Sequence, residues 1–193
     1  MSLFGWRVDE KYSAEGVLPE TWTFISRRAN IVLGGIDSYQ VKSRARDVSA
    51  ISLQAIEQHA AAVSCVVVEI EAETVDGHRR FLNTINFSDP IEDNADVRAI
   101  LAKLYKRLHG RRVDIHSDEV DLTIDLLLEA YQNSAGDPGC YKNDYEGYKA
   151  MASQLDSRGV RQSRDRSDVA FANTRAWRLL FDYLLSHYDY VNE

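Results

Sequence analysis

The residues of this sequence that could do chemistry concentrate in segment 113–121, VDIHSDEVD, where carboxylates stand beside an imidazole. On an extended strand, Asp114 and His116 would point to the same side. Asp118 would add a third ligand, and the set would suit Mg²⁺, Mn²⁺ or Zn²⁺. The competing interpretation, which is preferred, makes Ser117 the N-cap of a helix whose first-turn acids complement the helix dipole.

A second candidate is a thiol nucleophile. Cys140 lies in a loop rich in Gly and Pro, and His187 and Asp189 follow in chain order as a base and its acidic partner would. No signature of a cysteine enzyme surrounds Cys140, and His187 falls at the expected end of a helix, where the C-terminal dipole favours it. A structural or solvent-facing cysteine is therefore the preferred interpretation.

Two basic clusters stand out in a chain whose net charge is −7. Stretch 103–112 holds five positive charges and no acid, and stretch 158–166 holds four arginines and one aspartate. Either stretch could contact phosphates. The competing interpretations are that the positive charges of 103–112 complement the negative end of a helix dipole and that 158–166 is a solvated loop. Stretch 158–166 has no aromatic residue for base stacking, so binding to carboxylates of a protein is favoured at least as much as binding to nucleic acid. The candidate phosphate-binding residues are Lys106, Arg107, Arg111 and Arg112, and the candidate partner-binding residues are Arg158, Arg161, Arg164 and Arg166.

Aromatic residues gather near the C-terminus of the sequence. Trp177, Phe181 and Tyr183 fall on or beside the stripe of an expected helix and are predicted to belong mostly to the core. Tyr188 and Tyr190 extend beyond that helix and could contact a partner, since tyrosine is enriched at protein interfaces.

The clearest local pattern among the elements that would position these groups is a hairpin. Stretches 63–73 and 79–87 flank Asp76-Gly77, a dipeptide suited to a two-residue turn. With that turn as the loop, Val68 would face Ile85 on an apolar side, while the alternating glutamates would face water. The pattern predicts a β-hairpin over about 63–87. Short irregular strands are expected over 1–48.

Helices are predicted for most of the remaining sequence. Asn94 is a suitable N-cap for a helix over 94–109 that Gly110 would end, and Ser117 and Ser167 would cap helices over about 118–133 and 167–186. Less distinct helices are expected at about 49–62 and 144–157, with a short strand near Val113 and a linker over 157–168. The expected inward-facing residues are Val97, Ile100, Leu101, Leu104 and Leu108, then Val120, Ile124, Leu127, Leu128 and Tyr131, and finally Val169, Ala172, Ala176, Leu179, Leu180 and Tyr183.

The composition suits one globular domain, because the 193 residues are 45% apolar and 27% charged. We predict a single α+β domain over 1–193, in which a small antiparallel sheet built around the hairpin (about 63–87) packs with four to five amphipathic helices. Its N-terminal part, about 1–88, would be β-rich, and its C-terminal part, about 89–193, would be helical.

The cysteines and the first residues bear on location. Cys65 lies in an apolar run and is predicted to be a buried, reduced residue, although a disulfide stays open. The first ten residues do not resemble a signal peptide, and no window approaches the about 20 apolar residues of a membrane span. We expect a cytoplasmic protein that has no membrane contact.

No phosphate-binding loop, dinucleotide fingerprint, serine-hydrolase elbow or zinc motif occurs in the sequence. The leading hypothesis is a non-enzymatic accessory or assembly protein that binds another protein through the arginines of 158–166, the C-terminal aromatic residues or the hairpin edge. Nucleic acid could bind only through local basic patches, and no cofactor is predicted.

One alternative function is a divalent-metal-dependent hydrolase or nuclease using Asp114, His116 and Asp118. Another is an acidic inhibitor or immunity-type protein. The oligomeric state is left open.

Overall fold

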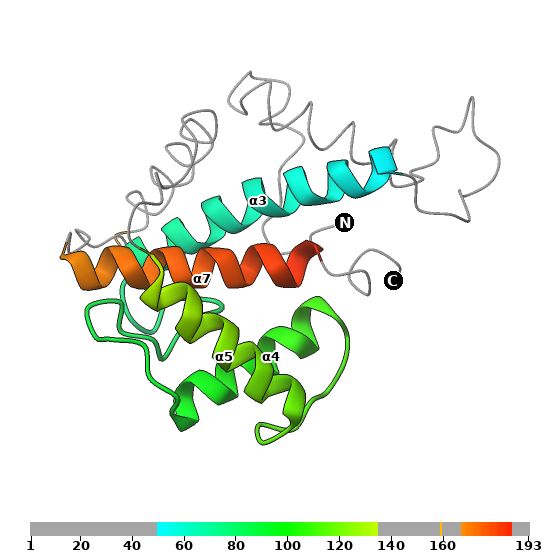
Figure 1. The fold of residues 1–193 in the computed structure, drawn as a ribbon. Helices are drawn as coiled ribbons and strands as arrows, with labels where there is room; N and C mark the ends of the chain where they lie inside the picture. The colour runs from blue at the N-terminus through cyan, green and yellow to red at the C-terminus, as the bar shows by residue number, and fades with distance from the viewer. Residues whose placement is uncertain (1–49, 135–158, 160–166, 187–193) are drawn as a thin grey trace.

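The computed structural model describes residues 50–134, 159 and 167–186, and this part of the chain is helical (Figure 1). It contains α3 (Ala50–Glu73), α4 (Ala95–Leu108), α5 (Asp118–Gln132) and α7 (Asp168–Ser186). These residues form no strand or sheet. The predicted α+β fold is therefore wrong for the part of the chain that is described.

Helix α7 is the centre of the packing. Helix α3 runs antiparallel along one side of it, α5 packs on the other side, and α4 packs against α5 (Figure 1). Trp177 and Phe181 of α7 are fully buried between these neighbours. The connection from α3 to α4 also joins the core, since the Phe81 ring meets the Phe181 ring edge-on with centroids 5.8 Å apart.

The predicted hairpin over 63–87 is wrong. Residues 63–73 are the second half of α3, and residues 79–87 are irregular chain, although the turn between them exists and Gly77 has a φ of 83°. All side chains from Val63 to Val68 are buried. A helix enclosed on every side is apolar all round, so its periodicity does not distinguish it from a buried strand. Burial here outweighs the preference of valine for strands.

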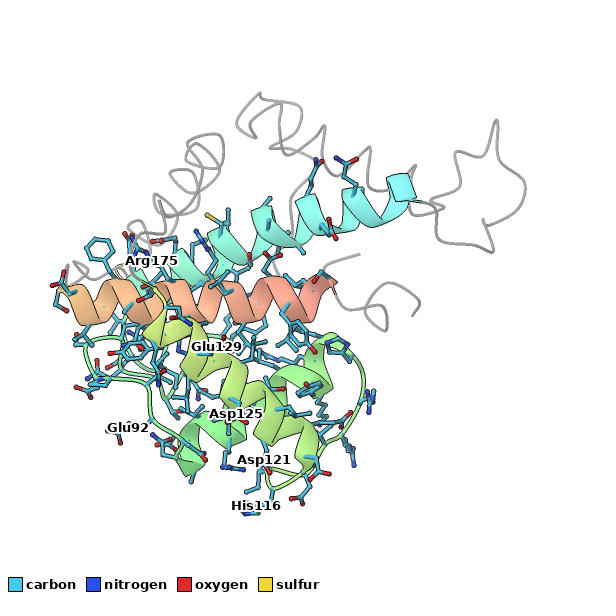
Figure 2. All side chains as sticks on the ribbon, viewed as in Figure 1. Glu92, His116, Asp121, Asp125, Glu129 and Arg175 are labelled. Atoms are coloured by element: carbon cyan, nitrogen blue, oxygen red, sulfur yellow. The ribbon has the colours of Figure 1, made fainter. Side chains whose placement is uncertain are left out.

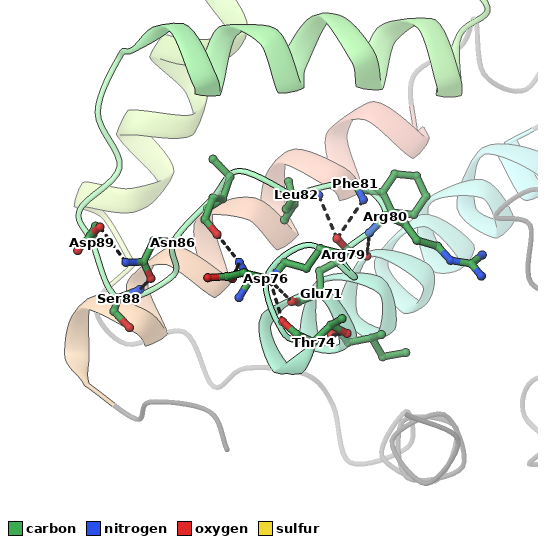
Figure 3. Close-up of polar contacts among 12 residues, drawn as sticks. Glu71, Thr74, Asp76, Arg79, Arg80, Phe81, Leu82, Asn86, Ser88 and Asp89 are labelled. Carbon is green, nitrogen blue, oxygen red and sulfur yellow. Dashed lines mark hydrogen bonds and ion pairs between the residues drawn. The ribbon is translucent and has the colours of Figure 1, made fainter. Parts of the chain in front are cut away.

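Glu71, which the hairpin would have turned toward water, is only 2% exposed. Its carboxylate accepts the backbone N–H groups of Arg80, Phe81 and Leu82, each at 3.0 Å (Figure 3). The buried Arg79 guanidinium donates to three backbone carbonyls of the same region. Side-chain to backbone hydrogen bonds therefore satisfy the chain where the hairpin would have used a strand ladder.

The predicted N-caps are confirmed. Asn94 Oδ1 accepts the backbone N–H groups of Asp96 and Val97 at 3.0 Å. Ser117 Oγ accepts from the N–H of the third residue of α5 at 3.4 Å, and Ser167 Oγ does the same for α7 at 3.2 Å. The expected first helix is the first half of α3, which continues to Glu73 instead of ending near residue 62.

The inward stripes are predicted well for two helices. All five expected residues of α4 are buried, as are three of the five in α5, where Leu128 and Tyr131 pack partly buried against the core. The short strand expected near Val113 does not form. Segment 1–48, the helix expected at 144–157 and all of the expected linker except Gly159, Ser167 and Asp168 lie outside the described residues.

In α7 the predicted inner face is displaced. Leu179 and Tyr183 were expected inside but are 43% and 44% exposed. Two neighbouring stripes of this helix are apolar at helical spacing, and the stripe with the larger rings, Trp177 and Phe181, is the one that is buried. Leu179 and Tyr183 are consequently left on the surface.

Cys65 is buried as expected, but it is disulfide-bonded and not reduced. The other cysteine of the sequence, Cys140, lies outside the described residues. Among the described helices, none has the length and apolar character needed to cross a membrane.

Candidate functional site

A pocket of about 160 Å³ opens where α4, α5 and the C-terminal half of α7 meet. Most of the lining residues belong to these helices, and those of α5 recur at helical spacing, so regular packing, and not an irregular loop, forms most of the wall. The lining residues are Tyr105 of α4 and His109 at its C-cap, Arg111 of the following connection, Glu119, Leu122, Thr123 and Leu126 of α5, and Tyr183 and Leu184 of α7.

The polar wall of the pocket is a chain of two hydroxyls. Thr123 Oγ1 lies 2.6 Å from the carbonyl oxygen of Glu119 and 2.8 Å from the Tyr105 hydroxyl. A threonine hydroxyl has one hydrogen and gives it here to the carbonyl, so Tyr105 is the donor of the second bond. Burial raises the pKa of the Tyr105 hydroxyl, which keeps it a neutral donor. This wall is therefore fixed in orientation.

An ion pair stands at the mouth of the pocket. Arg111 Nη2 lies 2.6 Å from Glu119 Oε1, and the two side chains are 48% and 43% exposed. A solvent-exposed pair of this kind contributes at most about 1 kcal/mol, so it exchanges partners at little cost. Either charge is therefore able to meet a ligand.

Part of the pocket lining is apolar and exposed. Leu122 has the highest exposure, 70%, of the large hydrophobic residues that the structure describes, and Tyr183 is 44% exposed. The other exposed large hydrophobic residues in the described ranges are Ile115, Phe171 and Leu179, none of which lines the pocket. We call the surface formed by Leu122, Leu126, Tyr183 and the Arg111–Glu119 pair the pocket face.

Two of the predicted metal ligands, Asp114 and His116, lie in the turn before α5, and the third, Asp118, begins the helix. Asp114 Oδ1 accepts the backbone N–H of His116 at 2.8 Å, and the carbonyl of Asp114 accepts from Ser117 Oγ, also at 2.8 Å. Asp118 is the first residue of α5 and is exposed. No three His, Cys, Asp or Glu residues in the described ranges are grouped so that they could hold a metal ion. The local geometry is that of a capped helix start.

Arg98 organises the charges near that turn, a role that the sequence analysis missed. Its guanidinium lies 2.6 Å from Asp93 and 2.7 Å from Asp121, and it donates to the carbonyl of Ile115 at 2.9 Å. These hydrogen bonds raise the pKa of Arg98 and lower the pKa of Asp93. Arg98 thereby joins the starts of α4 and α5 in a structural ion-pair network.

The candidate phosphate-binding residues are not equivalent in the structure. Arg107 donates to the carbonyl of Arg80 at 2.6 Å and lies over the Phe81 ring, 5.1 Å from its centroid. Arg111 is paired with Glu119, while Lys106 and Arg112 are exposed. The remaining candidates lie outside the described residues: Arg158, Arg161, Arg164, Arg166, Tyr188 and Tyr190, together with Cys140, His187 and Asp189.

Leu122 is the site residue that sequence reasoning missed most clearly. Its signal was present, since Asp118, Leu122, Asp125 and Glu129 follow one another at helical spacing. A single leucine on a helix face whose other residues are charged is expected to be exposed to solvent.

No protein-family model matches the sequence, and comparisons with curated proteins and with solved structures give no match either.

Proposed function

We propose that this chain is a non-enzymatic accessory or assembly protein that binds another protein through the pocket face. The observation that carries the proposal is the 70% exposure of Leu122 beside a pocket that Tyr183 also lines. Folding leaves this leucine in water, whereas a partner that covered it would gain about 1.5–3 kcal/mol from its burial.

The composition of the pocket face supports the same proposal. Protein interfaces combine an apolar centre with a polar rim, and tyrosine is among the residues that contribute most to binding. Here Leu122, Leu126 and Tyr183 supply the apolar centre, and the Arg111–Glu119 pair supplies part of the rim.

The metal-dependent alternative has no specific support in the described residues, since Asp114, His116 and Asp118 lie in a capping turn and at the helix start that follows it.

The cytoplasmic location also stays a prediction. The disulfide at Cys65 argues against it, because such bonds persist mainly in oxidising compartments.

The proposal is tested by photo-crosslinking from the surface of the full chain. A photoreactive phenylalanine analogue replaces Leu122 or, separately, Tyr183, and the cells that express the protein are irradiated. The control carries the analogue at Phe171, which is exposed on α7 but does not line the pocket. We expect one protein to crosslink from both pocket positions and not from position 171, and the substitution Tyr183→Asp to remove the crosslink from position 122. Absence of any protein adduct at both pocket positions, or identical adducts from all three, would overturn the proposal.

A further inference from the structure

Helix α5 presents a negative ridge beside the pocket. Its acidic residues are Asp118, Glu119, Asp121, Asp125 and Glu129, and it contains no basic residue. At 100° per residue, Asp118, Asp125 and Glu129 fall on one side of the helix together with the exposed Leu122. Figure 2 shows Asp121, Asp125 and Glu129 following one another along α5. We call Asp118, Asp125 and Glu129 the acidic ridge.

Contacts among the described residues do not account for the whole ridge. Asp118 complements the positive end of the helix dipole, and Asp121 is paired with Arg98. Asp125 lies beyond the first turn, and Glu129 lies in the last turn, where a negative charge is unfavourable. Neither forms an ion pair with a described residue. The spacing of four residues from Asp121 to Asp125 and on to Glu129 also makes these like charges repel one another.

Leu122 connects the acidic ridge to the pocket, since it lies on the same side of α5 as the ridge and also lines the pocket. A cavity of about 150 Å³ accommodates benzene, so a pocket of about 160 Å³ accepts one large apolar side chain. The ridge spans 11 residue steps from Asp118 to Glu129, which is about 16 Å along the helix at 1.5 Å per residue. An occupant must therefore combine an apolar anchor with positive charges spread over about three helical turns.

We propose that the pocket face binds a basic amphipathic helix of another protein. An apolar side chain of that helix enters the pocket beside Leu122 and Tyr183, and its Lys or Arg side chains meet Asp118, Asp125 and Glu129. The net charge of −7 attracts such a partner from a distance and repels nucleic acid. This inference rests on the proposed function and specifies the chemistry of the partner.

The test uses the full chain and three fluorescein-labelled probes. The first is a synthetic amphipathic peptide of leucine and lysine at helical spacing, the second is the same peptide with glutamate in place of lysine, and the third is single-stranded DNA. Fluorescence anisotropy measures binding of each. We expect the leucine–lysine peptide to bind and the other two probes not to bind.

Variants separate the specific surface from general charge attraction. We expect Leu122→Ser to weaken binding about tenfold and the double variant Asp125→Asn/Glu129→Gln to weaken it about fivefold. The double variant Asp89→Asn/Glu92→Gln removes the same number of exposed charges away from the ridge and is expected to change binding less than twofold. Circular dichroism confirms that each variant remains helical.

Three results would overturn the inference: equal or stronger binding of the leucine–glutamate peptide or DNA, no binding of the leucine–lysine peptide, or equal weakening by the ridge and control variants. If photo-crosslinking still captured a partner in that case, the proposed function would stand and only the chemistry assigned to the partner would fall. If crosslinking failed, the proposed function itself would fall.

Discussion

Glu71 and Arg79 are buried charged residues whose partners are mostly backbone groups. The Glu71 carboxylate accepts three consecutive backbone N–H groups. Arg79 donates to three carbonyls, pairs with Asp76 at 2.7 Å and lies over the Phe87 ring. Charge-assisted bonds of this kind offset the cost of removing a charge from water. Desolvation lowers the pKa of Arg79, and the nearby carboxylates of Asp76 and Glu71 oppose that effect. Through these backbone hydrogen bonds, Glu71 and Arg79 together hold the connection after α3 in one conformation.

Replacing Glu71 with alanine is expected to destabilise the protein by at least about 2 kcal/mol, because three N–H groups near the core lose their acceptor. Urea denaturation followed by circular dichroism measures the change. Glu92→Ala makes the same substitution at an exposed position and is expected to stay within about 0.5 kcal/mol of the parent. Equal stability of the two variants would show that the carboxylate does not hold the loop.

Asp182 provides a prediction about pH. Burial raises the pKa of this carboxyl above its ordinary value of 3.8, Arg178 opposes the shift, and Glu57 adds to it. A carboxyl whose folded pKa lies above its unfolded value weakens the fold at pH values where both states are ionised. We therefore expect Asp182→Asn to melt at the same temperature as the parent below pH 3.8 and at a higher temperature at pH 7. Thermal melts at pH 3 and pH 7 test this, and a variant that is less stable at pH 7 would contradict it.

At the scale of elements, capping was predictable and long-range pairing was not. Asn94, Ser117 and Ser167 were identified correctly because a cap depends only on the neighbouring residues. Stretch 63–73 was misassigned because its burial depends on α7, about a hundred residues later in the chain. The residues of the pocket face could not be predicted from the sequence for a similar reason. The residues of 113–121 that seemed able to do chemistry belong to a helix start. Leu122 lines a pocket only because α4 and α7 pack beside α5, and the local sequence does not show that packing.

Helix α5 is expected to show a conflict between stability and binding. Asp125→Lys replaces two repulsive contacts at four-residue spacing with attractive ones and should stabilise the protein by about 0.5 kcal/mol. Under the further inference, the same change should weaken binding of the leucine–lysine peptide, because function often costs stability at the positions that serve it. Asp118→Lys is the matched variant, because it makes the same charge change on the same ridge but opposes the helix dipole. It should weaken binding and also lower stability by about 0.5 kcal/mol. If both variants changed stability in the same direction, this electrostatic account of α5 would be wrong.

At the scale of the whole molecule, the described helices form a scaffold that carries the pocket face. The contacts of α7 with α3 and α5 enclose Trp177 and Phe181, and this packing fixes the position of Tyr183 relative to Leu122. Such packing is rigid, since cores are close to crystal density. The pocket face is therefore preformed, and under the proposed function this lowers the entropic cost of binding a partner.

The disulfide at Cys65 connects the stability of this scaffold to the compartment that contains it. We expect the protein purified without reductant to resist alkylation at Cys65 even when denatured, and to react after reduction. Reduction should destabilise the folded protein by about 2–4 kcal/mol, since a disulfide restricts the unfolded chain. Cys65→Ser is the control, because its denaturation midpoint should not respond to reductant. Acid quenching of intact cells, followed by alkylation of the denatured protein, then decides the location, because Cys65 is buried in the folded protein. If Cys65 is protected there until reduction, the compartment is oxidising. If Cys65 reacts at once, the bond is absent in the cell and the cytoplasmic prediction regains its support.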